Sequence, residues 1–323
     1  MLDERKELLK HEIVDYSVNV DSDICSILNW FSESHGFTAS QIVDASKILY
    51  DMVSNNEVTR ILSFTGNIIS TGLRGVITQL IRSGFFHIVI TTCGAIDHDI
   101  ARSMGGKYYR GVWYTDDRKL RELGIHRLGN VFIPIENYGL IIESFVRNLF
   151  KELSNVRNKW SIKELLYEAG LRIVDENSFL KACVDNKVTL VVPGILDGAF
   201  GTNLVIYSRI HGLNIDFIKD EEELLNIIFE SKKLGALIIG GGISKHHAIW
   251  ISQFRDGLDY AIYLTTAVEY DGSLSGAHPH EAITWGKVKP LAKQVVVYGD
   301  ATVTLPLIVL GLECLRRNRV KLD

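Results

Sequence analysis

The sequence predicts an α/β fold: a doubly wound, mostly parallel sheet with helices on both faces, Rossmann-like, preceded by an N-terminal helical arm. Two observations predict it. Short runs of apolar and β-branched residues recur along the chain, and amphipathic stretches lie between them. Buried parallel strands are apolar on both faces, and their alternation with helices is typical of such sheets.

Six runs predict strands, and each is followed by glycine or small residues: Thr59–Phe64, His87–Thr92, Val188–Val192, Ala236–Ile239, Ala261–Leu264 and Val295–Val297. Five stretches predict the helices between and after them: Ile68–Arg82, Ile141–Lys151, Glu221–Lys233, His247–Arg255 and Thr304–Arg316. The first 55 residues lie outside this alternation and read as helical. We therefore expect a helical arm over residues 1–55 and an α/β domain over residues 56–323, together forming one compact unit.

Composition excludes several classes of protein. A net charge of -4 carries no basic signature of nucleic-acid binding. No run approaches the ~20 apolar residues of a membrane helix, and the charged N-terminus is unlike a signal peptide. Four scattered cysteines without a paired CxxC motif argue against a disulfide framework and against a structural zinc site. We expect a cytoplasmic protein with neither a nucleic-acid nor a membrane partner.

Four polar or glycine-rich segments follow the first four predicted strands. They read FTGNIISTG, TTCGAIDHD, PGILDGAFGTN and GGGISKHH. In open parallel sheets ligands bind beyond the carboxyl ends of the strands, so four such loops on one edge describe a binding site. Gly240 to Gly242 would let a backbone approach a pyrophosphate at a helix N-terminus, although a tight turn explains them equally well.

A second cluster follows, around Lys287. A lysine in a dry setting loses its proton more easily and can then attack a carbonyl or an imine. Trp285 could flank a cationic amine and Glu281 could pair with it, whereas the ordinary reading makes them core and surface residues. His246 and His247 begin a predicted helix and point about 100° apart, so we expect one of them to face the site as a proton shuttle. No carboxylate or cysteine lies at metal-ligand spacing near them, so no metal is expected.

These residues resemble the deoxyhypusine synthase family. The resemblance is carried by GGGISKHH, YDGSLSGAHPHEAITWGK, VVVYGDATVTLPL, FTGNIISTGLRG, TTCGAIDHDIARSMGG, HRLGNVFIPIENY and LDGAFG, over about residues 44–315. It implies that NAD oxidises spermidine, that an enzyme lysine captures the aminobutyl group as an imine, and that a lysine of the translation initiation factor 5A precursor receives it. It also implies a homotetramer with sites at dimer interfaces.

The resemblance assigns roles residue by residue. Lys287 would be the nucleophile and His246 the proton shuttle. Residues implied to bind the polyamine are Asp97, His98, Thr202, Gly272, Ser273, Glu281 and Trp285. Residues implied to bind NAD are Gly66, Asn67, Ser70, Thr92, Cys93, Gly94, Asp197, Gly241, Thr266, Ala267, Asp300 and Ala301. The aspartates at 97, 197 and 300 also suit helix caps, as does Ser70.

The sequence departs from eukaryotic members at four positions where they hold acids or an amide. These positions are occupied by His98, Thr202, Trp250 and Leu274, a pattern that resembles the archaeal branch. Fewer acidic anchors keep an alternative open, namely the same transfer with another amine donor or acceptor, as in a homospermidine synthase. A non-catalytic NAD-binding protein would not need the intact WGK segment. An NAD-consuming deacylase would need motifs that are absent here.

Overall fold

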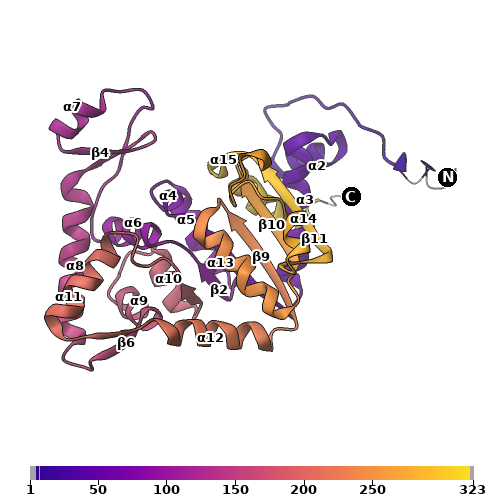
Figure 1. The fold of residues 1–323 in the computed structure, drawn as a ribbon. Coiled ribbons are helices and arrows are strands. Elements are labelled where there is room, and N and C mark those ends of the chain that lie inside the picture. The colour runs from indigo at the N-terminus through magenta and orange to yellow at the C-terminus, as the bar shows by residue number, and fades with distance from the viewer. Residues whose placement is uncertain (1–4, 7, 321–323) are drawn as a thin grey trace.

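The computed structural model describes residues 5–6 and 8–320, and it confirms the predicted α/β fold (Figure 1). Its main sheet has six strands that all run parallel. In spatial order they are β11 (Val288–Tyr298), β10 (Leu258–Thr265), β9 (Lys233–Ile239), β1 (Val58–Phe64), β2 (Ile88–Ile90) and β7 (Thr189–Val191). Each strand overlaps one of the six predicted runs.

The order of these strands contains one reversal. The chain enters at β1, proceeds through β2 to β7 at one edge, and then returns to β9 on the other side of β1 before continuing to β10 and β11. The direction of winding therefore switches between β1 and β9. In doubly wound sheets the crevice at this switch point is where ligands bind.

Helices cover both faces of the sheet. Along β9, Leu234, Ala236 and Ile238 belong to one buried cluster, whereas Leu237 and Ile239 belong to the other. Because successive side chains of a strand point to opposite faces, this alternation places a hydrophobic core on each side. The helices α3 (Phe37–Ser54), α5 (Leu73–Arg82) and α15 (Ala301–Arg316) bury side chains in one core, and α12 (Phe217–Glu230), α13 (Gly242–Ser252) and α14 (Pro279–Thr284) in the other.

The remaining elements complete the chain. The helices are α2 (Ile24–Ser34), α4 (Gly66–Ile69), α6 (Cys93–Ser103), α7 (Asp117–Glu122), α8 (Gly139–Leu153), α9 (Ile162–Leu171), α10 (Phe179–Asp185) and α11 (Ala199–His211), with 3-10 turns η1 (Ile135–Asn137), η2 (Gln253–Arg255) and η3 (Glu269–Asp271). Two small sheets contain β3 (Tyr109–Arg110), β5 (Val131–Pro134) and β4 (Ile125–Leu128), and β6 (Lys159–Ser161) with β8 (Asn214–Asp216). These strands have two to four residues, too few for a periodic pattern, and the sequence analysis missed them.

All five predicted helices have different limits in the structure: α8 and α15 extend beyond the predicted ranges by two or three residues, and the other three predictions differ more. The predicted helix Ile68–Arg82 is two helices, α4 and α5, since the chain turns between them and Thr71 Oγ1 donates to the carbonyl of Ile68 at 2.7 Å. The stretch Glu221–Lys233 ends as a helix at Glu230, because Lys233 already pairs in β9. The stretch His247–Arg255 belongs to a helix that begins earlier, at Gly242.

The predicted N-terminal arm contains the helices α2 and α3, whereas residues 12–19 form neither helix nor strand. Helix α3 is part of the layer that covers the sheet. Thr38 Oγ1 donates to the carbonyl of Tyr298 at 3.1 Å, and Ser46 Oγ lies 3.4 Å from the carbonyl of Ile308 in α15. The predicted domain boundary near residue 55 falls between α3 and β1, and the division into two domains stays a prediction.

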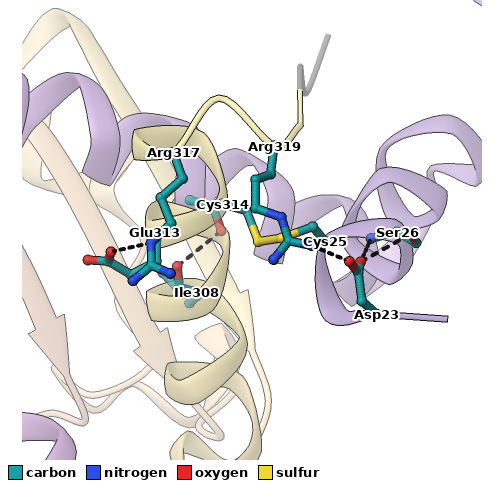
Figure 2. Close-up of a disulfide and its surroundings, with 9 residues drawn as sticks. Asp23, Cys25, Ser26, Ile308, Glu313, Cys314, Arg317 and Arg319 are labelled. Atoms are coloured by element: carbon teal, nitrogen blue, oxygen red, sulfur yellow. Dashed lines mark hydrogen bonds and ion pairs between the residues drawn. A yellow bond between two sulfur atoms is a disulfide. The ribbon is translucent and has the colours of Figure 1, made fainter. Parts of the chain in front are cut away.

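A disulfide joins Cys25 in α2 to Cys314 in α15 (Figure 2). The expectation that these cysteines stay unpaired is therefore wrong. The two residues are separated by 289 positions, so no local spacing of cysteines predicts the bond. The packing of α2 on α15 brings their Cα atoms to 5.8 Å. Cys93 and Cys183 are free and buried. No helix in the described part of the chain is long and apolar enough to cross a membrane.

Candidate active site

Four helices begin at the carboxyl edge of the sheet without a capping side chain at the N-cap position. Thr65 precedes α4, Thr92 precedes α6, Gly198 precedes α11 and Gly241 precedes α13, and none of these residues caps its helix through a side chain. The first N–H groups of a helix have no partner within the helix, and they carry the positive end of its dipole. The first N–H groups of α11 are taken by the Asp97 carboxylate. The N-termini of α4, α6 and α13 therefore offer donors to an anionic ligand at this edge.

Two of these loops meet at the switch point between β1 and β9. A Cβ added to Gly240 would lie 2.9 Å from Thr65 Oγ1, and Gly240 has a φ of +83°, a conformation that favours glycine. Gly242, with a φ of +67°, faces open space, since no atom lies within 4 Å of the position of its Cβ. The crevice predicted from the strand order is thus bordered by close-packed backbone and opens above the N-terminus of α13.

The predicted cofactor residues lie along this edge, in the six segments that follow the strands of the main sheet. Gly66 packs against Gly94, because a Cβ there would come within 2.8 Å of the Gly94 carbonyl carbon. Asn67 is exposed, and its Oδ1 accepts from Thr65 Oγ1 at 2.5 Å. The buried Ser70 hydroxyl donates to the Asn67 carbonyl at 2.6 Å, so it is satisfied within its own turn.

The remaining predicted cofactor residues lie after β10, β11 and β7. Thr266 is exposed, while the Ala267 N–H donates to Thr265 Oγ1 at 3.0 Å. Asp300 is exposed and caps α15, accepting from the Thr302 N–H at 2.6 Å directly before Ala301. Asp197 is exposed in the turn that precedes α11.

Asp97 is held inside the protein. Its carboxylate accepts from the N–H groups of Ala199 at 2.8 Å and Phe200 at 2.7 Å, and from the Tyr138 hydroxyl at 3.3 Å; only 1% of the residue is exposed. Burial raises the pKa of this carboxyl, and the backbone donors oppose the shift. Asp97 therefore fixes the turn at the start of α11, and among the described residues no amine pairs with its carboxylate.

Cys93 and His98, on the same helix as Asp97, are also buried within the protein. Cys93 is fully buried, and burial raises the pKa of its thiol to about 12, so the group stays protonated. His98 is buried with its Nδ1 2.8 Å from the Tyr108 hydroxyl, and desolvation lowers the pKa of His98 to about 4. Thr202 is exposed, and its hydroxyl donates to the Gly198 carbonyl at 3.0 Å.

Lys287 lies on the other half of the sheet, at the start of β11. It is only 9% exposed, and its Nζ lies 5.4 Å from the centroid of the Trp285 ring and 5.8 Å from that of Trp250. Trp285 is 66% exposed and Trp250 42%. The ordinary reading, with a buried tryptophan and a surface lysine, is thus reversed. Among the described residues, no carboxylate lies within ion-pair distance of Lys287 Nζ.

His246 faces Lys287, whereas His247 turns away. The His246 ring stacks on Trp250 with centroids 5.9 Å apart. Desolvation, and then the charge of Lys287, lower the pKa of His246, so its imidazole is neutral at pH 7 and can accept a proton. His247 Nε2 instead lies 3.2 Å from a carboxylate oxygen of Glu221 in α12. The expectation that only one of the two histidines serves this site fits this geometry.

Lys245 is a buried lysine that the sequence analysis did not single out as a site residue. It is 1% exposed and donates from Nζ to the carbonyls of Ala277 at 2.8 Å and Ser275 at 3.4 Å. Its Nζ also lies 4.4 Å from the centroid of the Tyr263 ring. Desolvation lowers the pKa of Lys245 to about 8, with Glu281 acting in the opposite direction. Its position in the GGGISKHH motif was the available signal.

Lys245 holds the loop that contains Gly272 and Ser273. Both residues are exposed, and the Ser273 N–H donates to Asp271 at 2.6 Å. Leu274 is half-buried and packs against the core under α13, so its side chain is engaged in the core of the same chain. Glu281 is exposed on α14, beyond ion-pair distance of any described lysine.

The structure thus brings the predicted residues together as two groups. Lys287, Glu281 and Trp285 precede β11, and His246 lies near Lys287 on α13, whereas Asp97 and His98 follow β2. Four strand spacings separate β11 from β2, about 19 Å at the usual distance between strands. Within the described residues, Lys287 and Asp97 therefore lie beside different strands of the sheet.

A parallel, doubly wound sheet with a crevice at its switch point defines a Rossmann-like α/β protein as a class. The family model "DS: Deoxyhypusine synthase" matches residues 26–312. The chain belongs to the deoxyhypusine synthase family, and it is accordingly an enzyme, a transferase of hypusine biosynthesis.

Its relatives include the probable deoxyhypusine synthases of Sulfolobus acidocaldarius, 54% identical over 95% of this chain and 99% of that protein, and of Thermoplasma acidophilum, 48% identical over 95% and 98%. A crystal structure of a candidate deoxyhypusine synthase from Entamoeba histolytica shares the fold, with a TM-score of 0.67 at 21% identity over 94% of this chain and 97% of that one.

Proposed function

We propose that this enzyme transfers the 4-aminobutyl group of spermidine, in an NAD-dependent reaction, to one lysine of the translation initiation factor 5A precursor and so forms deoxyhypusine. The observation that carries the proposal is the setting of Lys287. Its amine is buried between two indoles beside the neutral imidazole of His246, and no carboxylate in the described part of the chain pairs with it. A carboxylate would favour the ammonium, which is not a nucleophile.

NAD suits the crevice at the switch point. The uncapped N-termini of α6 and α13 would donate to its phosphates, and the open space above Gly242 admits a ligand close to the backbone. The exposed carboxylate of Asp197 or Asp300 would accept from ribose hydroxyls. When bound, NAD would accept a hydride from spermidine and later return it to the product.

The chain's own residues would perform the transfer. The amine of Lys287 adds to the C=N bond of the oxidised spermidine, and diaminopropane leaves, so that the butyl fragment stays on Lys287 as an imine. His246 would take the proton that the lysine loses and return it to the leaving amine. The acceptor lysine then displaces Lys287 by the same exchange.

We also propose that the complete site forms between two copies of the chain in a homotetramer. The support is that Lys287 and Trp285 precede the amino end of β11, whereas Asp97 and His98 follow the carboxyl end of β2, four strands away in the sheet. A second copy would let the surface near Asp197 and Thr202 of one protomer approach Trp285 of the other. We place the reaction in the cytoplasm, where a precursor of a translation factor is available.

A direct test combines the purified enzyme, NAD, spermidine and the translation initiation factor 5A precursor. The precursor should gain the mass of one aminobutyl group on a single lysine, with release of one diaminopropane, and only when NAD is present. An unmodified precursor after complete consumption of spermidine would contradict the assignment of the acceptor.

One observation favours a second candidate, the same transfer with another amine donor or acceptor. His98, Thr202 and Leu274 are all engaged within the chain, so none adds a charged anchor for the far end of spermidine. Incubation with spermidine and putrescine, without any protein acceptor, tests it: accumulation of homospermidine would favour this candidate.

A further inference from the structure

Trp250 lies at the centre of a row of aromatic rings on the exposed side of α13. Its ring stacks on His246 at 5.9 Å and meets Phe254 edge-on at 6.0 Å, and Phe254 lies 6.5 Å from Phe229. At the His246 end of this row, Lys287 Nζ lies 5.8 Å from the Trp250 ring and 5.4 Å from the Trp285 ring. The amine is therefore flanked by two indoles from different elements.

This position of Trp250 is unusual for a structural tryptophan. It is 42% exposed, and its indole nitrogen makes no hydrogen bond to any described residue. Packing of the chain on itself therefore leaves a large part of the ring available. Trp285, 66% exposed, is available in the same way. We call Trp250 and Trp285, with Lys287 between them, the indole clamp.

An indole attracts a cation through the negative face of its ring, and its area also covers methylene groups. A linear polyamine presents both features, because its ammonium groups alternate with short methylene chains. A carboxylate in the same place would bind the polyamine too, but it would also stabilise the ammonium form of a neighbouring lysine. Two indoles hold a cationic ligand without adding a negative charge next to the nucleophile.

We propose that Trp250 is a specificity-determining residue, which together with Trp285 binds the aliphatic amine donor at Lys287 by cation–π and apolar contact. The inference rests on the proposed function, and it adds the means of recognising the amine in a chain whose positions 98, 202 and 274 carry no acid. Ring faces therefore add to the recognition of the donor, beside the exposed carboxylate of Glu281.

The test measures spermidine binding to the full-length enzyme with NAD, for Trp250→Phe and Trp250→Leu. The loss of a desolvated cation–π contact corresponds to about 5- to 30-fold weaker binding. For Trp250→Leu we expect that loss of spermidine affinity and a matching rise in the KM of spermidine. For Trp250→Phe we expect both values to stay within about threefold of wild type. An uncharged chain of the same length, with hydroxyls in place of the terminal amines, should bind wild type and Trp250→Leu within about threefold of each other, because it gains no cation–π contact.

Phe229→Leu is the matched control, since it removes an exposed aromatic ring from the far end of the same row and should leave spermidine binding unchanged. Unchanged spermidine binding by Trp250→Leu would overturn the clamp, as would an equal loss for the uncharged chain. The mass adduct that spermidine and borohydride leave on wild-type Lys287 reports the proposed function separately. If wild type neither forms the adduct nor binds any polyamine, both inferences fail.

Discussion

At the scale of single residues, the account depends on the side chain of Lys287. It is buried, close to His246, and flanked by rings. Lys287→Arg keeps a positive charge, but a guanidinium stays protonated and cannot form an imine. Aminobutyl transfer should fall to background in this variant, measured as NAD-dependent release of diaminopropane. Lys289→Arg is the control, because Lys289 pairs with Asp259 at 2.8 Å and should retain full turnover. Turnover by Lys287→Arg would contradict the mechanism.

The second prediction concerns Lys245. Burial lowers its pKa in the folded state to about 8 from 10.5. Between these values the unfolded chain binds the proton and the folded chain does not, so the contribution of this lysine to stability rises with pH, by roughly 3 kcal/mol across the window. Lys245→Met should abolish that rise.

The measurement for Lys245 is the free energy of unfolding in denaturant at pH 7.5 and pH 10, as a difference between wild type and variant. The exposed Lys232→Met is the control and should leave the difference between the two pH values unchanged. An identical pH dependence in wild type and Lys245→Met would show that this amine does not titrate in the window.

Among the helices and strands, the N-terminus of α13 gives the clearest test of the proposed NAD site. Gly242 has a φ of +67° and faces open space. A side chain there would enter the region proposed for the phosphates, so Gly242→Ala should weaken NAD binding by at least about tenfold, which titration calorimetry measures. Gly84→Ala is a matched control, since Gly84 has a φ of +68° and equally open surroundings at the end of α5. Equal NAD affinity in both variants would place the cofactor elsewhere.

The strands and the loops of this sheet differ in how far the sequence predicts them. The six central strands follow from apolar runs because both faces of each strand are buried. The short β3 and β4 carry no such run, and they pair with the apolar β5 (Val131–Pro134) in a small antiparallel sheet. The internal turn at Ser70 to Gly72 was missed because helical periodicity continues across it, while side-chain hydroxyls satisfy the backbone locally.

At the scale of the whole molecule, the Cys25–Cys314 disulfide ties the first described helix of the arm to the last helix. Closing a loop of this length removes entropy from the unfolded chain, so Cys25→Ala with Cys314→Ala should lower the free energy of unfolding by about 2–5 kcal/mol. Denaturant unfolding without reductant measures the loss. Reductant should destabilise wild type to a similar extent and leave the double variant unchanged. Four free thiols in the unreduced, denatured wild type would show that the bond is absent.

Contacts between segments that are distant in sequence limit how much of the site the sequence predicts. Motif spacing predicts that Lys287, His246 and Trp285 share one site, and in the structure these residues lie near one another, while their roles stay predictions. Motif spacing did not reveal that the Asp97 carboxylate accepts hydrogen bonds from the first turn of α11. Nor did it reveal that Trp250 lies beside Lys287, or that Lys245 binds the carbonyls of the loop before α14. Those contacts arise where loops distant in sequence pack together, and no local pattern encodes them.

Capture of the amine by Lys287 is tested by the intact mass of the enzyme after incubation with NAD and spermidine and then with borohydride. We expect a stable gain of one aminobutyl group, mapped to Lys287 and absent without NAD. An adduct on another lysine, or none with any polyamine, would contradict the claim that Lys287 captures the amine.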